Sequence, residues 1–115
     1  MYEDETVRTS SAIRGDDFVL RVQGELDADS CEQFEEALLK ATTASGARTV
    51  VDLSQMTFAD STVLHLLLAA RLAHQRAERP FFLAGPFQLP VERLLEVTGT
   101  LGFFPLYVLG TADGV

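Results

Sequence analysis

The stretch that decides the fold reads RTVVDLSQMTFADSTVLHLLLAARLAHQRA, from residue 48 to residue 77. It opens with Arg48-Thr49-Val50-Val51-Asp52-Leu53, a β-branched run that is typical of a buried central strand. Ser54-Gln55-Met56 predicts a polar turn, and the residues from Ser61 to Ala77 have the composition of a helix. A buried strand joined by a short turn to an apolar helix is the unit from which α/β domains are built.

The helix in this stretch is apolar almost all round from Val63 to Ala70. Such a helix is either buried on two sides or leaves one apolar face for a partner. Its later turns are more polar, and we expect His74 to lie on the surface.

Towards the N-terminus, residues 17–23 alternate apolar and polar side chains, which predicts a half-buried strand. Residues 6–13 predict an earlier strand paired with it as a hairpin. Gly24-Glu25-Leu26-Asp27 is expected to break the strand, after which Asp27 or Asp29 caps a helix that Gly46 ends. Apolar residues at helical spacing form the core face of that helix: Cys31, Phe34, Leu38 and Ala41.

Towards the C-terminus, Pro80 ends the apolar helix, and Phe81-Phe82-Leu83-Ala84 predicts another buried strand. Pro90 suits the first turn of a further helix, where its missing N–H is harmless. Residues 103–108 predict a last strand, placed at the sheet edge by Pro105. The order β-β-α-β-α-β-α-β predicts an α/β fold with a largely parallel sheet and helices packed on it.

Length and composition predict one domain over residues 1–115, with mobile ends. No apolar stretch reaches the roughly 18 residues of a membrane span, and the acidic N-terminus is unlike a signal peptide, so we expect a cytoplasmic protein. Cys31 is the one cysteine, which excludes an intramolecular disulfide and argues against a thiolate metal site. No Walker-type loop or dinucleotide fingerprint occurs, so no cofactor is predicted.

The net charge of −8 is concentrated in the first third of the chain. Residues 1–36 hold eleven acids and three arginines, whereas the six acids and six bases of residues 37–115 cancel. Such a chain repels nucleic-acid phosphates, so direct DNA binding is not expected. The acidic region either steers a basic partner or is a solvated surface that aids solubility.

The segment Thr57-Phe58-Ala59-Asp60-Ser61-Thr62-Val63-Leu64 is the most informative for function. It places Ser61 near a helix N-terminus, where backbone N–H groups and the helix dipole favour an anion. A phosphate on Ser61 would add about −1.5 to −2 charges beside Asp60, so it could change binding without unfolding the domain. Alternatively, Asp60 or Ser61 is only a helix cap worth about 1 kcal/mol.

Gly24-Glu25-Leu26-Asp27 and Phe58-Ala59-Asp60-Ser61-Thr62-Val63-Leu64 together resemble the two signature stretches of STAS domains in bacterial anti-sigma-factor antagonists. The segment from Val91 to Gly99 resembles the third helix of that family and its ending. The resemblance covers about residues 6–108. It implies a single STAS domain, with a mixed β-sheet of four to five strands and helices packed on one side.

The resemblance also implies a switch rather than an enzyme. In the family, the unphosphorylated antagonist binds an anti-sigma factor that is also a serine kinase, and so frees the sigma factor for transcription. The kinase phosphorylates the serine that follows the aspartate of the second motif, here Ser61, with Thr62 a weaker candidate, and a serine phosphatase reverses the reaction. The partner-binding residues that it implies are Asp27, Asp60, Ser61, Thr62, Leu64 and His65.

The chain departs from the family pattern at Val63, where the family usually has glycine. A regular helical backbone accepts valine, but its bulk is expected to lie where a kinase must approach closely.

Two other functions stay open. Small STAS proteins also serve as subunits on the ATPase of lipid-transport complexes, in which case the helix from Ser61 would be a constitutive docking surface. The spacing of Ser61 and His65 suggests an esterase nucleophile, although no third orienting group is evident. The oligomeric state is open too, since Phe81-Phe82 and Phe103-Phe104 fit either a core or an interface.

Overall fold

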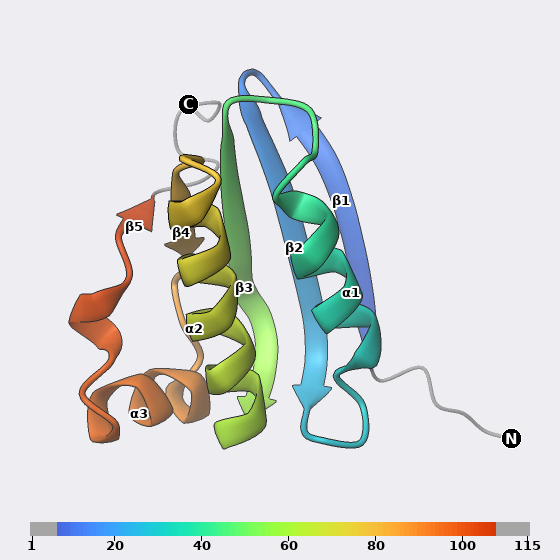
Figure 1. Cartoon of the computed structure of the whole chain (residues 1–115). Coiled ribbons are helices and arrows are strands. Elements are labelled where there is room, and N and C mark those ends of the chain that lie inside the picture. Colours follow the sequence, from blue (N-terminus) through green and yellow to red (C-terminus); the bar gives the residue numbers. More distant parts are fainter. Residues whose placement is uncertain (1–6, 108–115) are drawn as a thin grey trace, which may run out of the picture.

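A computed structural model describes residues 7–107 of the 115-residue chain. The two ends that the sequence predicts to be mobile, residues 1–6 and 108–115, lie outside the described residues. Figure 1 shows the arrangement of the secondary structure. The elements, in chain order, are β1 (Arg8–Arg14), β2 (Asp17–Leu26), α1 (Glu32–Ala41), β3 (Arg48–Ala59), α2 (Ser61–Arg76), β4 (Phe81–Ala84), α3 (Leu89–Val97), a 3-10 turn (Leu101–Phe103) and β5 (Leu106–Tyr107).

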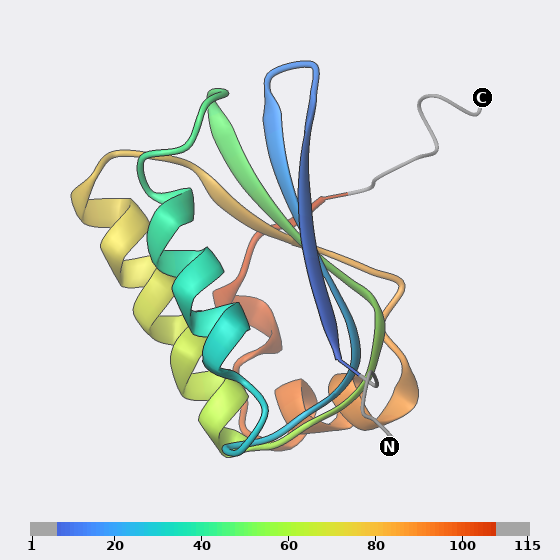
Figure 2. The same cartoon turned by 90° about the vertical axis from the view of Figure 1, so that its right-hand side faces the viewer.

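The strands form one five-stranded sheet in the order β1-β2-β3-β4-β5. β1 pairs antiparallel with β2, as predicted for the hairpin, and the other neighbours pair in parallel. α1 and α2 lie on one face of the sheet, and α3 lies near the end where the parallel strands stop (Figures 1 and 2). The mixed sheet with helices on one side is therefore confirmed.

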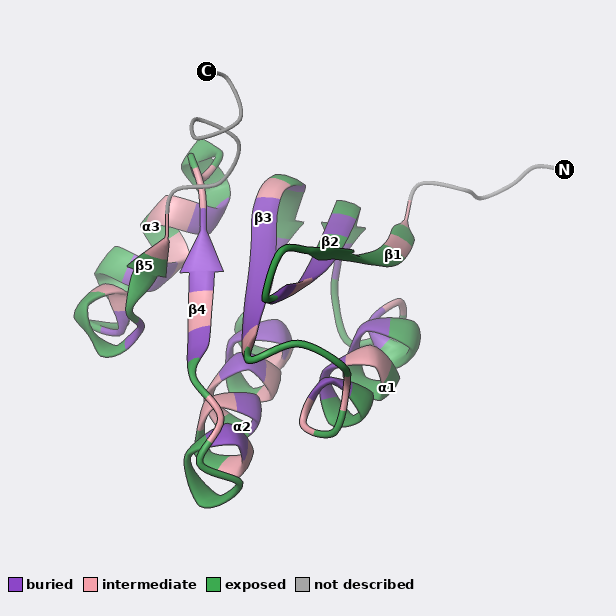
Figure 3. Cartoon of the chain, turned by 90° about the horizontal axis from the view of Figure 1, so that it is seen from above, coloured by how far each residue is buried: buried purple, intermediate pink, exposed green. Residues whose placement is uncertain are grey.

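The main core lies between the helices and the sheet. It joins residues of α1, α2 and α3 to the inner face of the strands, with Phe34, Leu20 and Leu53 among the fully buried side chains. At about 25 cal/mol for each Å² of apolar surface removed from water, this layer is the main stabilising contribution. Figure 3 shows that burial is densest on β3 and β4 and lowest on β1.

β3 is longer than the sequence predicts. The expected turn at Ser54-Gln55-Met56 is wrong, because the strand continues to Ala59 and Met56 is fully buried. Two register shifts against β2 give β3 two extra residues, and as a result Leu53, Met56 and Ala59 all contribute to the main core. The expected break at Gly24 is wrong for the same reason, since β2 runs on to Leu26 and Gly24, at φ 106°, lies at one of these shifts.

The start and end of α1 also differ from the prediction. Cys31 occupies the cap position, without a side-chain cap hydrogen bond, so neither Asp27 nor Asp29 caps this helix. The helix ends at Ala41, five residues before Gly46. Gly46 lies at φ 91°, and a Cβ atom there would come 2.9 Å from the Asp16 carbonyl oxygen, so the close packing of this loop against the β1–β2 hairpin requires glycine.

A second, smaller apolar cluster lies on the helix-free face of the sheet, where Val19, Val50 and Ala84 pack together. Phe82 and Tyr107 cover its edge, with ring centroids 5.4 Å apart. β5 is an edge strand, as predicted for this segment, although a 3-10 turn replaces the extended backbone expected at Phe103, and Val108 lies outside the described residues.

A polar link on this face joins the C-terminal end of the described chain to the start of β2. The Tyr107 hydroxyl donates to one oxygen of Asp17 at 2.7 Å, and Arg48 Nε donates to the other at 2.5 Å. Burial of Asp17 opposes its ionisation, but these two hydrogen bonds outweigh that effect and lower the pKa of the carboxyl group. The bond to the carboxylate likewise raises the pKa of Tyr107.

The prediction that His74 lies on the surface is wrong, because its side chain is fully buried. Its Nδ1–H donates a hydrogen bond to the Ala70 carbonyl oxygen at 2.7 Å, so Nε2 is left to accept one from the Thr49 hydroxyl at 3.0 Å. Arg79 Nε donates to the same Thr49 oxygen at 2.7 Å. The polar residues around His74 in the sequence could not reveal this burial, because the ring lies against Thr49 on β3, which also binds Arg79 beyond the end of α2.

Burial of His74 predicts a loss of stability in mild acid. Desolvation is the main cause that lowers the pKa of His74 below 6.5, with nearby Arg79 adding to it. Because the folded state then binds the proton less readily than the unfolded state, the free energy of unfolding is highest above pH 6.5 and falls below it, by up to about 1.4 kcal/mol per pH unit. Urea unfolding at pH 7.5 and 5.5 would measure this, and His74→Gln should remove most of the difference. If the free energy of unfolding fell by the same amount between pH 7.5 and pH 5.5 in both proteins, the prediction would be contradicted.

Within residues 7–107, no helix is both long enough and apolar enough to cross a membrane.

Candidate partner-binding site

The signature segments meet at the end of the sheet where β2 and β3 stop. The loop after β2 and the junction between β3 and α2 lie side by side there, at the foot of α2 in Figure 1. Parallel strands bring their carboxyl ends to one edge, so residues about thirty positions apart become neighbours. The register Leu26↔Ala59 fixes this placement.

Asp60 holds the two segments together. One carboxylate oxygen accepts hydrogen bonds from the backbone N–H groups of Thr62, at 3.0 Å, and Val63, at 3.3 Å, which caps α2. The other oxygen accepts from the N–H of Ala28 in the neighbouring loop, at 3.1 Å. The predicted helix cap is confirmed, and the same side chain also fixes the β2–α1 loop against α2.

Ser61 is the first residue of α2 and is exposed. Among the described residues its hydroxyl makes no hydrogen bond, so it is accessible to a partner protein. The N–H groups that favour an anion at this helix start are already bonded to Asp60, and a phosphate on Ser61 would therefore meet a carboxylate as its nearest charged neighbour.

Asp27 is exposed in the adjoining loop and orders it. Its carboxylate accepts from the Asp29 N–H and from the Ser30 hydroxyl, both at 3.0 Å. Below this loop, burial raises the pKa of the Cys31 thiol, and the nearby acids Glu35, Asp60 and Asp27 add to the effect. The thiol is thus kept protonated and out of reach.

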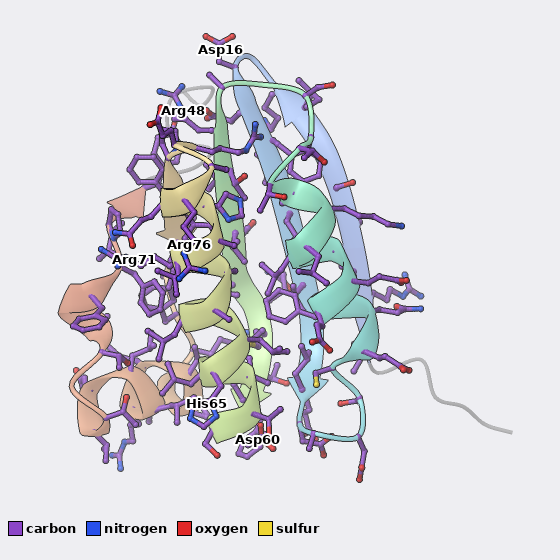
Figure 4. All side chains as sticks on the ribbon, in the orientation of Figure 1. Asp16, Arg48, Asp60, His65, Arg71 and Arg76 are labelled. Carbon is purple, nitrogen blue, oxygen red and sulfur yellow. The ribbon has the colours of Figure 1, made fainter. Side chains whose placement is uncertain are left out.

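The first turns of α2 divide the remaining expected residues between surface and core. His65 is exposed and Thr62 is half-buried, whereas Leu64 is only 5% exposed and contributes to the core instead of the surface where we expected it. Figure 4 shows His65 and Asp60 at the foot of α2. No hydrogen bond joins Ser61 to His65 in the part of the chain that the structure describes.

Val63 is fully buried in the main core. Its side chain is therefore not part of the surface around Ser61, where we expected its bulk to lie.

Two exposed apolar side chains at this end of the molecule were not predicted from the sequence. Phe58 is 44% exposed beside Glu25, at the end of β3, and Leu89 is 59% exposed at the start of α3. The chain order of the strands could have suggested Leu89, because α3 follows the next parallel strand and so begins at the same edge. Among residues 7–107, no group of His, Cys, Asp and Glu side chains is arranged to hold a metal ion.

Comparisons with known proteins show which proteins share this fold. Among solved structures, an anti-sigma factor antagonist from Mycobacterium paratuberculosis is 26% identical, with a TM-score of 0.80, over 93% of this chain and 89% of that chain. A variant of RsbS from Moorella thermoacetica, with glutamate in place of a serine, is 25% identical, with a TM-score of 0.70, over 90% and 89%. The phosphorylated form of the Bacillus cell fate determinant SpoIIAA shares the fold at 16% identity, with a TM-score of 0.66, over 94% and 95%.

A search of curated proteins found no match. A family model described as "Mlab, STAS domain" matches residues 9–105, which is most of the chain. The protein belongs to the STAS domain family.

Proposed function

We propose that this protein is an anti-sigma-factor antagonist, a regulatory binding protein without enzymatic activity. Its unphosphorylated form would bind an anti-sigma factor with serine kinase activity, and phosphorylation of Ser61 would release it. The observation that carries this proposal is the exposed, unbonded Ser61 hydroxyl at the start of α2, beside Asp60 and the Asp27 loop. Similar solved proteins are anti-sigma factor antagonists, one of them in a phosphorylated form.

The charge at the site explains how phosphorylation would act. A phosphoserine adds about −1.5 to −2 charges. At Ser61 that charge would directly follow Asp60, whose carboxylate already occupies the N–H groups of Thr62 and Val63, and it would lie at the same edge as the loop that holds Asp27. A partner docked here would bury this charge, and desolvating it without a new cation weakens binding. A serine phosphatase would restore the binding form.

The first test is a binding measurement on Ser61→Asp. We expect the dissociation constant for a kinase-type anti-sigma factor to rise by about tenfold or more, which is about 1.4 kcal/mol of binding free energy. Ser45→Asp is the matched control, since it adds the same charge on an exposed loop at the opposite end of the sheet. Equal affinity for wild type and Ser61→Asp would sink the phosphoswitch.

Mass spectrometry tests whether Ser61 is phosphorylated. After incubation with ATP and the anti-sigma factor, intact-mass spectrometry should show one added phosphate, about 80 Da, in the wild type and none in Ser61→Ala. A shift that survives in Ser61→Ala would move the modified residue to Thr62 or elsewhere.

A second candidate function is a constitutive subunit of a lipid-transport ATPase or of another regulatory complex. Leu72, 47% exposed on α2 two turns beyond the described site, favours it, because an apolar side chain there suits a permanent interface. Co-purification with an ATPase that is insensitive to Ser61→Asp would support this function over the switch.

A further inference from the structure

The edge of the sheet formed by β1 is open. β1 is the first strand in the sheet order, and no element of residues 7–107 lies beyond it (Figures 2 and 3). Its seven residues are exposed apart from Thr9, which is half-buried. All the described backbone hydrogen bonds of this strand go to β2, so the N–H and C=O groups of alternate residues face outward without a partner strand.

This edge lacks most of the features that protect natural sheet edges. It has no proline, no bulge in its pairing with β2 and, within the part of the chain that the structure describes, no helix or loop across it. The other edge strand, β5, is only two residues long. What β1 does carry is an arginine at each end, Arg8 and Arg14, and no acidic residue between them.

The pairing with β2 shows which way the β1 side chains point. Arg8, Ser10, Ala12 and Arg14 lie opposite Gln23, Arg21, Val19 and Asp17, on the helix-free face. Because side chains alternate along a strand, Thr9, Ser11 and Ile13 lie on the helix side. A strand added beside β1 would therefore meet arginines at two places on one face and these three residues on the other.

A groove on the helix side adjoins the edge. It holds about 340 Å³ between β1, β2 and α1. Phe18, Leu20 and Ala37 are its apolar lining residues, and the polar ones include Thr9 and Ser11 together with one acid, Glu36, and one base, Lys40. Together with Ile13, which is 50% exposed, the groove suits small apolar side chains at alternate positions of an added strand.

We infer that the open edge of β1 binds an extended acidic segment of a partner protein by β-strand addition. The backbone groups of β1 supply the affinity, the groove takes the apolar side chains, and Arg8 and Arg14 select acids on the opposite face. Two copies of β1 paired antiparallel about Ser11 would place Arg8 opposite Arg14 at both ends, so the same charges oppose the symmetric pairing of two copies. This surface is separate from Ser61, and the inference does not depend on the proposed switch.

The probe is the peptide acetyl-Glu-Val-Thr-Val-Thr-Val-Glu-amide with a fluorescent label. It has acids at the spacing of Arg8 and Arg14 and reads the same in both directions, so the test does not depend on strand orientation. The control peptides replace both glutamates with lysine, or carry N-methyl groups on the valines or, separately, on the threonines. Fluorescence anisotropy measures the affinity of the full-length protein for each peptide, and amide chemical shifts show which backbone groups respond.

We expect the glutamate peptide to bind about fivefold or more tightly than the lysine peptide, with shifts centred on residues 8–14. Arg8→Glu/Arg14→Glu should reverse this preference, and tighter binding of the lysine peptide also shows that the variant is folded. One of the two N-methylated peptides should lose binding, because one set of alternate amides must pair with the strand. Ser61→Asp should leave the affinity unchanged.

Four outcomes would overturn the inference. The first is equal binding of the glutamate and lysine peptides, or no binding of either. The second is full binding of both N-methylated peptides, and the third is loss of peptide affinity in Ser61→Asp. The fourth is a concentration-dependent dimer in light scattering that Arg8→Glu/Arg14→Glu abolishes, which would assign the edge to a second copy of the chain.

Discussion

Replacing Arg79 with methionine is expected to lower the free energy of unfolding by about 3 kcal/mol. The guanidinium group donates to three carbonyl oxygens of the loop between α1 and β3 and to that of Arg48 at the start of β3, at 3.0–3.3 Å, and to the Thr49 hydroxyl at 2.7 Å. Methionine keeps most of the apolar stem but leaves these acceptors without their donor. The partly buried acceptors then keep the full desolvation penalty of an unsatisfied polar group.

Arg76→Met is the matched control for this prediction. Arg76 is an exposed arginine at the end of α2, three residues before Arg79, without a hydrogen bond or ion pair among the described residues, so its loss should change stability by less than about 0.5 kcal/mol. Urea unfolding of both variants at pH 7.5 gives the comparison. A loss for Arg79→Met as small as that of the control would show that the loop does not depend on this side chain.

Val63→Gly, which restores the usual family residue, is expected to cost about 3 kcal/mol. Burial of the fully buried valine contributes about 2 kcal/mol of this, and glycine in a helix costs about 1 kcal/mol more. Ala69→Gly is the control for the second part, because Ala69 is exposed in the middle of the same helix. Chemical denaturation should therefore show a clearly larger loss for Val63→Gly than for Ala69→Gly.

The same variant separates stability from access to Ser61. Because the Val63 side chain lies in the core, the phosphorylation rate of Ser61 should be the same in Val63→Gly and wild type at a temperature where both are folded. A much faster reaction of the glycine variant would mean that valine does restrict the kinase, through the backbone of the first helical turn.

Much of the fold follows from periodicity in the sequence. The hairpin, the alternation of strands and helices and the Asp60 cap could all be predicted, because each depends on neighbours a few residues away. The length of β3 could not be predicted, because its register shifts depend on its pairing with β2. Without that pairing, the polar pair Ser54-Gln55 indicates a turn. The burial of His74 depends on Thr49, 25 residues away, and has no local pattern.

The candidate site was predictable in position but not in detail. The short motifs locate Ser61, Asp60 and Asp27, and parallel strand order brings them together. That Leu64 and Val63 point inward could not be predicted, because apolar residues occur almost all round this helix and only its packing chooses the buried side. The bond from Ala28 to Asp60 is likewise a product of the tertiary structure.

The bond between Tyr107 and Asp17 has a consequence for how the protein is made. It joins residues 90 positions apart, so a chain still growing on the ribosome has β2 long before it has the hydroxyl that completes the far side of the sheet. Until then Asp17 has Arg48 but not Tyr107 as a partner, and the small cluster around Val50 has Phe82 but not Tyr107 over its edge. A chain that ends shortly before residue 107 would have all three helices but an incompletely covered sheet, the kind of intermediate that chaperones retain.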